Sequence, residues 1–298
     1  MQSSQASIAI NYVLLISIWA TTPLAIVWSV SDVHYMWALV LRFWLALPLA
    51  VILLCVLRLK LPINLTALHS YLAGAMSFIG SQVFTYISTN YLSSGMIALM
   101  FGLAPIIAGL IGFFIFKQKL KATQWLGMLI AVIGLSVICF SGSSQHVQPI
   151  GIILMLCSVS IYALSIYWVK AVNARLQPMT QATGSILLSV IFTLFIIPFI
   201  WQYFPTHIPS EKSLFGIIYA VIMASLVAMF CYFKLVQSVS ATTLSLTTVI
   251  TPMLAILIGS WLNNEQLTFM ILVGAGILVF GLFVYFYKDL MDQKFKKR

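Results

Sequence analysis

Residues 93–137 read SSGMIALMFGLAPIIAGLIGFFIFKQKLKATQWLGMLIAVIGLSV, and the chain repeats this pattern once. Pro105 and Pro252 are 147 residues apart. The same offset relates three glycine pairs without a gap: Gly112 and Gly259, Gly127 and Gly274, and Gly134 and Gly281. Apolar residues often match by chance, whereas a proline and three glycines at one fixed offset rarely do. The sequence therefore predicts a duplicated unit.

The composition argues against a water-soluble domain. Hydrophobic residues make up 62% of the 298 residues and charged residues 7%, whereas soluble domains contain about 25% charged residues. The formal charge of +10 would suggest nucleic acid as the partner of a soluble chain. Here the basic residues gather on one side of a predicted membrane, so we expect a protein of the lipid bilayer that binds no nucleic acid.

Apolar runs of about 20 residues, each enough to cross about 30 Å of hydrocarbon, predict ten transmembrane helices. We expect them at residues 8–30, 35–57, 67–90, 93–116, 123–140, 150–171, 180–203, 213–237, 241–261 and 268–287. The repeat then divides the chain into residues 1–145 and residues 146–298, the second unit ending in a short basic tail. Five crossings per unit is an odd number, so the second unit enters the membrane from the opposite side. The predicted fold class is all-α integral membrane, with ten helices in a 5+5 inverted repeat.

The basic residues predict the orientation of the chain. With the N-terminus in the cytoplasm, the cytoplasmic loops hold most of the bases, including Lys117, Lys119, Lys121 and Lys170. The opposite loops then hold Lys212 alone. By the positive-inside rule, both termini are cytoplasmic. We expect a multi-pass protein of the cell inner (plasma) membrane, as a monomer or homodimer.

An inverted repeat in a membrane protein typically surrounds a substrate site near the bilayer midplane that is reached from each side in turn. The leading hypothesis is therefore a secondary transporter that exports a small metabolite such as an amino acid. The fixed charges in or near the spans, Arg42 and Lys234, are positive and suit a carboxylate better than an organic cation. Multidrug or organic-cation efflux and metabolite uptake are the alternatives within this class.

A membrane-embedded enzyme is less well supported. Such chemistry needs paired acids, a nucleophile with its base, or metal ligands at depth. No predicted span holds an Asp or Glu in its middle, and every histidine lies in or beside a loop. The sequence also lacks the G-x4-G-K-[ST] motif for ATP. We therefore expect no enzyme activity and no cofactor, and transport driven by a gradient or by facilitated diffusion.

Several motifs resemble those of the EamA family in the drug/metabolite transporter superfamily. They are the triplet Leu41-Arg42-Phe43 in the second span, the prolines of the fourth and ninth spans, and a short polar loop followed by Gly-x6-Gly. The resemblance covers nearly the whole chain. It implies a central cavity lined by spans one to four and six to nine, with spans five and ten at the periphery. In that family an acid commonly follows the fourth and ninth spans; Glu265 matches it, whereas its copy here is Gln118.

Polar and aromatic stripes mark the candidate substrate site. Gln82, Tyr86 and Asn90 recur at i, i+4 and i+8 in the third span, which places them on one helical face. Such a face is unfavourable in lipid, so it is expected to line a cavity rather than to bond neighbouring helices. The further candidates for substrate binding are Asn11, Trp19 and Thr22 in the first span, Arg42, Tyr162 in the sixth span, and Ser245 and Thr248 in the ninth.

Charged residues and prolines each leave two interpretations. Arg42 either binds a substrate carboxylate or is structural, snorkelling outward or bracing neighbouring carbonyls. Lys234 is expected to snorkel, with an anchor for an anionic group as the alternative. Glu265 is interpreted as structural or as an anion at the start of the tenth span, rather than as a coupling carboxylate. Pro105 and Pro252 are candidate gating hinges or static kinks.

Overall fold

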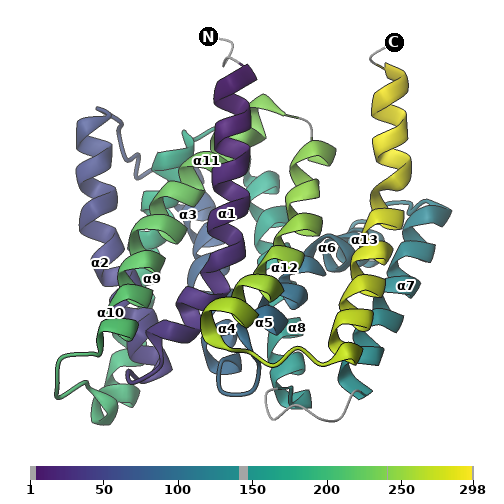
Figure 1. Cartoon of the computed structure of the whole chain (residues 1–298). Helices are drawn as coiled ribbons and strands as arrows, with labels where there is room; N and C mark the ends of the chain where they lie inside the picture. Colours follow the sequence, from purple (N-terminus) through teal and green to yellow (C-terminus); the bar gives the residue numbers. More distant parts are fainter. Residues whose placement is uncertain (1–4, 141–146, 240, 297–298) are drawn as a thin grey trace.

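The computed structural model describes residues 5–140, 147–239 and 241–296, which are almost entirely helical. The first helix, α1 (Gln5–Ser29), begins at the same face of the bundle at which the last, α13 (Phe269–Lys296), ends (Figure 1). We call it the terminal face. The helix α13 runs to Lys296 rather than ending at residue 287 as expected.

The described chain forms ten helical segments, as predicted. The first, second and fifth segments are α1, α2 (Tyr35–Val56) and α7 (Ala122–Phe140). The third segment consists of α3 (Leu65–Ala75), η1 (Met76–Ser81) and α4 (Gln82–Ser88), and the fourth consists of α5 (Ser94–Gly102) and α6 (Ala104–Phe114). The sixth and seventh segments are α8 (Pro149–Val172) and α9 (Pro178–Ile200), and the ninth and tenth are α12 (Ala241–Asn263) and α13. The eighth segment consists of α10 (Glu211–Tyr219), η3 (Ala220–Val227) and α11 (Ala228–Ser238). A short turn, η2 (Trp201–Tyr203), follows α9.

Among the described residues, eight helices are long and apolar enough to cross a membrane. The third segment and α12 are the two that fall outside this group. The third carries the polar stripe described above, which lowers its hydropathy. Both nevertheless pack inside the bundle, the third against α8 and α9 and α12 against α5 and α1. The chain is therefore a multi-pass membrane protein built from two five-helix halves.

The turn after the fourth segment recurs after α12 in the same backbone geometry. Lys117 and Asn264 have φ angles of 56° and 51° and are 147 residues apart. In both turns the next residue donates its N–H to a glycine carbonyl six residues back, Gln118 to Gly112 at 3.0 Å and Glu265 to Gly259 at 3.3 Å. The duplication is thus preserved in hydrogen bonding as well as in sequence.

Two π-helical segments occupy related places in the two halves. The offset of 147 carries η1 from residues 76–81 onto residues 223–228, which overlap η3. A π-helical turn inside an α-helix often lies at a functional site, because it widens the helix and redirects its side chains. The predicted third and eighth helices are therefore irregular where they cross the centre of the bundle.

The prolines have unequal effects on their helices. The fourth segment breaks at Leu103, two residues before Pro105, whereas Pro252 lies inside the continuous helix α12. A proline lacks the N–H of a helical hydrogen bond and crowds the preceding turn, which explains the break. A role for either proline as a hinge stays a prediction.

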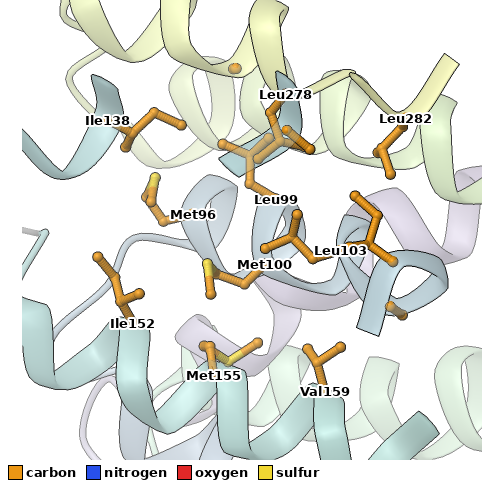
Figure 2. Packing of buried hydrophobic residues seen from close by; sticks show 14 of the residues in the cluster. Met96, Leu99, Met100, Leu103, Ile138, Ile152, Met155, Val159, Leu278 and Leu282 are labelled. Carbon is orange, nitrogen blue, oxygen red and sulfur yellow. The ribbon is translucent and has the colours of Figure 1, made fainter. Parts of the chain in front are cut away.

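A hydrophobic core joins the two halves. Figure 2 shows Met96, Leu99 and Met100 of α5 between side chains of the second half, which include Ile152, Met155 and Val159 of α8 and Leu278 and Leu282 of α13. Burial of these side chains on both sides of the interface stabilises the pairing of the halves.

Glycines bring α7 and α13 into close backbone contact. A Cβ atom added at Gly127 would lie 2.6 Å from the carbonyl oxygen of Gly281, and one at Gly134 would lie 2.7 Å from that of Gly274. The contacting pairs have rising residue numbers in α7 and falling residue numbers in α13, so the two helices run antiparallel. Each copy of Gly-x6-Gly therefore packs on the other, as small residues do between membrane helices.

We predict that Gly134→Ala lowers the melting temperature of the purified protein in detergent. The added methyl group meets backbone atoms, which yield less than a flexible side chain, and overpacking of this kind costs about 1–3 kcal/mol. Gly276→Ala is the matched control, because a Cβ atom at Gly276 of α13 meets nothing within 4 Å. Equal melting temperatures for the two variants would contradict the close contact.

Candidate substrate cavity

A cavity of about 380 Å³ lies between the two halves. Its lining comes from the first four and the sixth to ninth helical segments, and no described residue of α7 or α13 contributes. This confirms the arrangement implied by the family resemblance. The volume falls within the range of small-molecule sites, about 300–1,000 Å³.

Most of the expected site residues border this cavity. They are Trp19, Thr22, Arg42, Gln82, Tyr162 and Thr248, together with the expected hinge residue Pro252. Ala104 lines the cavity, whereas Pro105 beside it does not. Ser245 lies outside the residues whose side chains the structure describes. That the lining residues bind substrate stays a prediction.

Three expected site residues lie elsewhere. Asn11 donates its amide to the carbonyl of Ser7, one turn back in α1, at 2.6 Å. Tyr86 is fully buried in a hydrophobic cluster, and Asn90 is exposed in the turn after α4, where it bonds the carbonyl of Ile87 at 3.2 Å. Residues spaced by four rotate by about 40° per step around a helix. The predicted stripe therefore leaves the cavity after Gln82.

Other polar groups of the third segment bond a neighbouring helix. The hydroxyls of Ser81 and Thr85 lie 2.9 and 2.8 Å from that of Ser158 in α8. The third segment thus combines both roles weighed for it, with Gln82 on the cavity and these hydroxyls between helices.

Arg42 is the charged residue at the centre of the site. It is 5% exposed, and its guanidinium points inward. Its Nε donates to Ser225 Oγ at 3.1 Å and its Nη1 donates to Gln82 Oε1 at 3.2 Å. Among the described residues no carboxylate lies beside it. Snorkelling to the surface is therefore wrong for Arg42, and it braces side chains rather than backbone carbonyls.

The two partners of Arg42 lie next to or within the two π-helical segments. Gln82 directly follows η1, and Ser225 lies within η3, where its hydroxyl also donates to the carbonyl of Ala220 at 2.9 Å. Since η1 and η3 belong to different halves, the guanidinium joins the halves across the cavity.

A polar cluster at the start of α9 escaped prediction. Gln181 Oε1 accepts from Ser70 Oγ at 2.6 Å, and its Nε2 donates to Ser70 O at 2.8 Å and to Ser185 Oγ at 3.2 Å. Both Gln181 and Ser185 line the cavity. The available signal was a dense run of polar residues in an otherwise apolar span, including Thr180 and Thr183.

An aromatic wall forms another side of the cavity. We use this name for Trp19, Phe101, Tyr162 and Tyr232, which all line it. The ring centres of Trp19 and Tyr232 are 5.5 Å apart, and those of Phe101 and Tyr162 are 6.2 Å apart and nearly perpendicular. Two of these rings come from each half.

The cavity extends toward the terminal face. It reaches Lys170, an exposed residue in the last turn of α8, which the sequence suggested only as a determinant of topology. Lys234 also lies toward this face and donates to Ser7 Oγ at 3.1 Å. Toward the opposite face the lining ends at buried residues, Ile26 and Ala98.

Glu265 of the second half forms hydrogen bonds with the first half at the face opposite the termini. Its carboxylate accepts from the N–H of Ser94 at 3.0 Å, the hydroxyl of Ser94 at 2.7 Å and the N–H of Gly95 at 3.2 Å. It therefore caps α5, not the tenth helix as expected. The tenth helix has its own cap, since Thr268 Oγ1 accepts from the N–H of Ile271 at 3.3 Å.

Asn263 adds to this contact. Its Nδ2 donates to Glu265 Oε1 at 3.2 Å, while its Oδ1 accepts from Trp28 Nε1 at 2.9 Å and from Lys212 Nζ at 3.2 Å. The end of the cavity away from the termini is thus covered by bonded groups from both halves.

The fold and cavity define a membrane transporter, and comparison with known proteins agrees. The EamA-like transporter family model matches residues 7–140 and 149–287, so the chain belongs to this family.

Sequence identity to individual relatives is low. The chain is similar to the uncharacterized transporter YdfC of Bacillus subtilis (strain 168), at 24% identity over 99% of this chain and 96% of that one. It is also similar to the uncharacterized inner membrane transporter YedA of Escherichia coli (strain K12), at 24% identity over 74% and 72% of the two chains. A solved crystal structure shares the fold with a TM-score of 0.66, at 14% identity over 94% of this chain and 96% of its own.

We predict that Glu265→Ala lowers the melting temperature of the protein by the equivalent of about 1–3 kcal/mol, because buried donors at the start of α5 lose their acceptor. Gln118→Ala is the control at the corresponding position of the other half, where the side chain is exposed. A loss no larger for Glu265→Ala than for Gln118→Ala would exclude Glu265 as a contact between the halves.

Proposed function

We propose that this chain is a secondary transporter that exports a small metabolite with a carboxylate group, the class that includes the amino acids expected from the sequence. The observation that carries the proposal is Arg42. Its buried guanidinium borders a solute-sized cavity and has no acid beside it among the described residues. A charge in this position is costly unless an anion or water accompanies it.

The proposed mechanism is alternating access between the units 1–145 and 146–298. The cavity reaches the terminal face, and contacts of Glu265 and Asn263 cover its other end. We propose that these contacts break when the halves rock, while Arg42 retains the solute. The oligomeric state, monomer or homodimer, stays a prediction.

We further propose that the terminal face is cytoplasmic, in the inner membrane. Lys117, Lys119 and Lys121 lie in the connection between α6 and α7, on the same side as the termini by the count of crossings. Positive charges in short loops favour the cytoplasmic side. In that orientation the cavity receives solute from the cytoplasm, which supports export.

A cysteine introduced at Lys119 is expected to react with a membrane-impermeant reagent from the cytoplasmic side, and one at Asn263 from the outer side. The measurement is labelling of intact cells and of inverted vesicles. Labelling of both positions from the same side would refute the inverted arrangement, and exchanged sides would reverse the proposed orientation.

Export is tested in cells that overexpress the protein, grown with toxic amino acid analogues, toxic carboxylic acids and cationic drugs. We expect increased tolerance of compounds that carry a carboxylate. Gln82→Leu should remove most of this tolerance, because it removes both a brace of Arg42 and an amide donor, whereas Tyr86→Phe should retain it, because the hydroxyl of Tyr86 has no partner among the described residues. Tolerance of cationic drugs alone would favour organic-cation efflux, and increased sensitivity to carboxylates would favour uptake.

A further inference from the structure

The cavity offers its solute hydrogen-bond donors. The Nη2 group of Arg42 has no protein partner among the described residues. The Oε1 atom of Gln82 accepts from a guanidinium, which can only donate, and this fixes the amide orientation. Its Nε2 group, without a described partner, is therefore a second donor. Lys170 adds a third donor at the mouth.

Negative charge is missing from the described lining. The chain has five acidic residues. Asp32 bonds the N–H of Ser210 at 2.6 Å, Glu211 begins α10, and Glu265 caps α5. The remaining acids, Asp289 and Asp292, belong to α13, which does not line the cavity in the described chain. Among the described lining residues, an ammonium group would find two fixed positive charges and no counter-charge.

The strong acceptors of the lining are already engaged. Gln82 Oε1 accepts from Arg42 and Gln181 Oε1 accepts from Ser70, and Ser225 Oγ, next to the lining residue Ala224, also accepts from Arg42. The hydroxyls of the lining, among them those of Ser77, Tyr162 and Thr251, are neutral groups that donate as readily as they accept. An ammonium has three donors and no acceptor, so moving it here from water leaves it poorly satisfied.

The aromatic wall supplies the apolar part of the site. Its rings at Trp19, Tyr232, Tyr162 and Phe101 lie against one another in pairs and give this side of the cavity an aromatic surface. A flat aromatic group packs on such a surface in stacked or edge-to-face geometry. Wall and guanidinium border the same cavity, which therefore fits a ring joined to an acid.

We infer that, within the carboxylate class of the proposed function on which this inference rests, the cavity selects aromatic monocarboxylates that carry no ammonium group. The carboxylate binds the Nη2 group of Arg42 and the Nε2 group of Gln82. The ring packs on the aromatic wall, and Lys170 attracts the anion to the mouth.

The test compares 3-phenylpropanoate with ligands that each differ from it by one group. Radiolabelled 3-phenylpropanoate is bound to the full-length protein in detergent at pH 7 and competed with L-phenylalanine, which adds an ammonium, phenethylamine, which replaces the carboxylate by an amine, and butanoate, which lacks the ring. We expect 3-phenylpropanoate to bind more tightly than phenylalanine and butanoate by on the order of tenfold or more, and phenethylamine not to compete.

Variants of the protein test which residues bind the carboxylate and which bind the ring. Arg42→Gln should weaken binding of 3-phenylpropanoate on the order of tenfold or more, and Trp19→Leu should weaken 3-phenylpropanoate but not butanoate. Trp44→Leu is the matched control, because Trp44 is 43% exposed and lies outside the cavity lining. Unchanged melting temperatures establish that each variant is folded, and a variant that melts early is replaced by Arg42→Lys or Trp19→Phe, which should show smaller losses in the same direction.

Each other outcome overturns the inference. Phenylalanine binding as tightly as 3-phenylpropanoate shows that the ammonium is accepted, and competition by phenethylamine shows a site for organic cations. If 3-phenylpropanoate fails to bind while phenylalanine or butanoate binds through Arg42, the inference falls and the proposed function stands. If no carboxylate binds the folded protein, both fall.

Discussion

The guanidinium of Arg42 is a permanent positive charge inside a bundle that spans a membrane, and the surrounding structure has to make that charge tolerable. It does so without a described acid, by placing Gln82 of one half and Ser225 of the other within hydrogen-bond distance. Neutral acceptors stabilise a buried cation less than a carboxylate does. We propose that the site thereby keeps affinity for an anion, which a permanent ion pair would have removed.

The arrangement of the halves follows from where close contacts occur. Gly134 and Gly274 hold α7 and α13 together through backbone contact, away from the cavity. Such close backbone contact leaves the two helices little room to slide past each other. Next to the cavity the halves meet through the ring contacts of the aromatic wall and through polar contacts, those of Arg42 in the centre and of Glu265 at the covered end. Hydrogen bonds can exchange partners, so the polar contacts are the places where the proposed motion between the halves is easiest to accommodate.

The sequence predicted the helical segments, the duplication and the position of the cavity, because each depends on a pattern that is local or periodic. Pro105 and Pro252 set the register of the repeat, and Arg42 was recognisable as an ionisable residue within a span. The cap of α5 by Glu265 was missed because it depends on a contact between residues 171 positions apart. The π-helical turns were missed as well, since no simple periodicity marks them, although Gln82 directly follows one and Ser225 lies within the other.

The account is tested most directly by thiol reactivity inside the cavity. Ser77 lines it and is partly exposed, so a Ser77→Cys protein whose native cysteines are replaced by serine reports on access and on charge together. Anionic and cationic methanethiosulfonate reagents of similar size are applied to oriented vesicles from each side. The account predicts reaction from the side of the termini, faster with the anionic reagent. Reaction from the opposite side, or faster reaction with the cationic reagent, would contradict it.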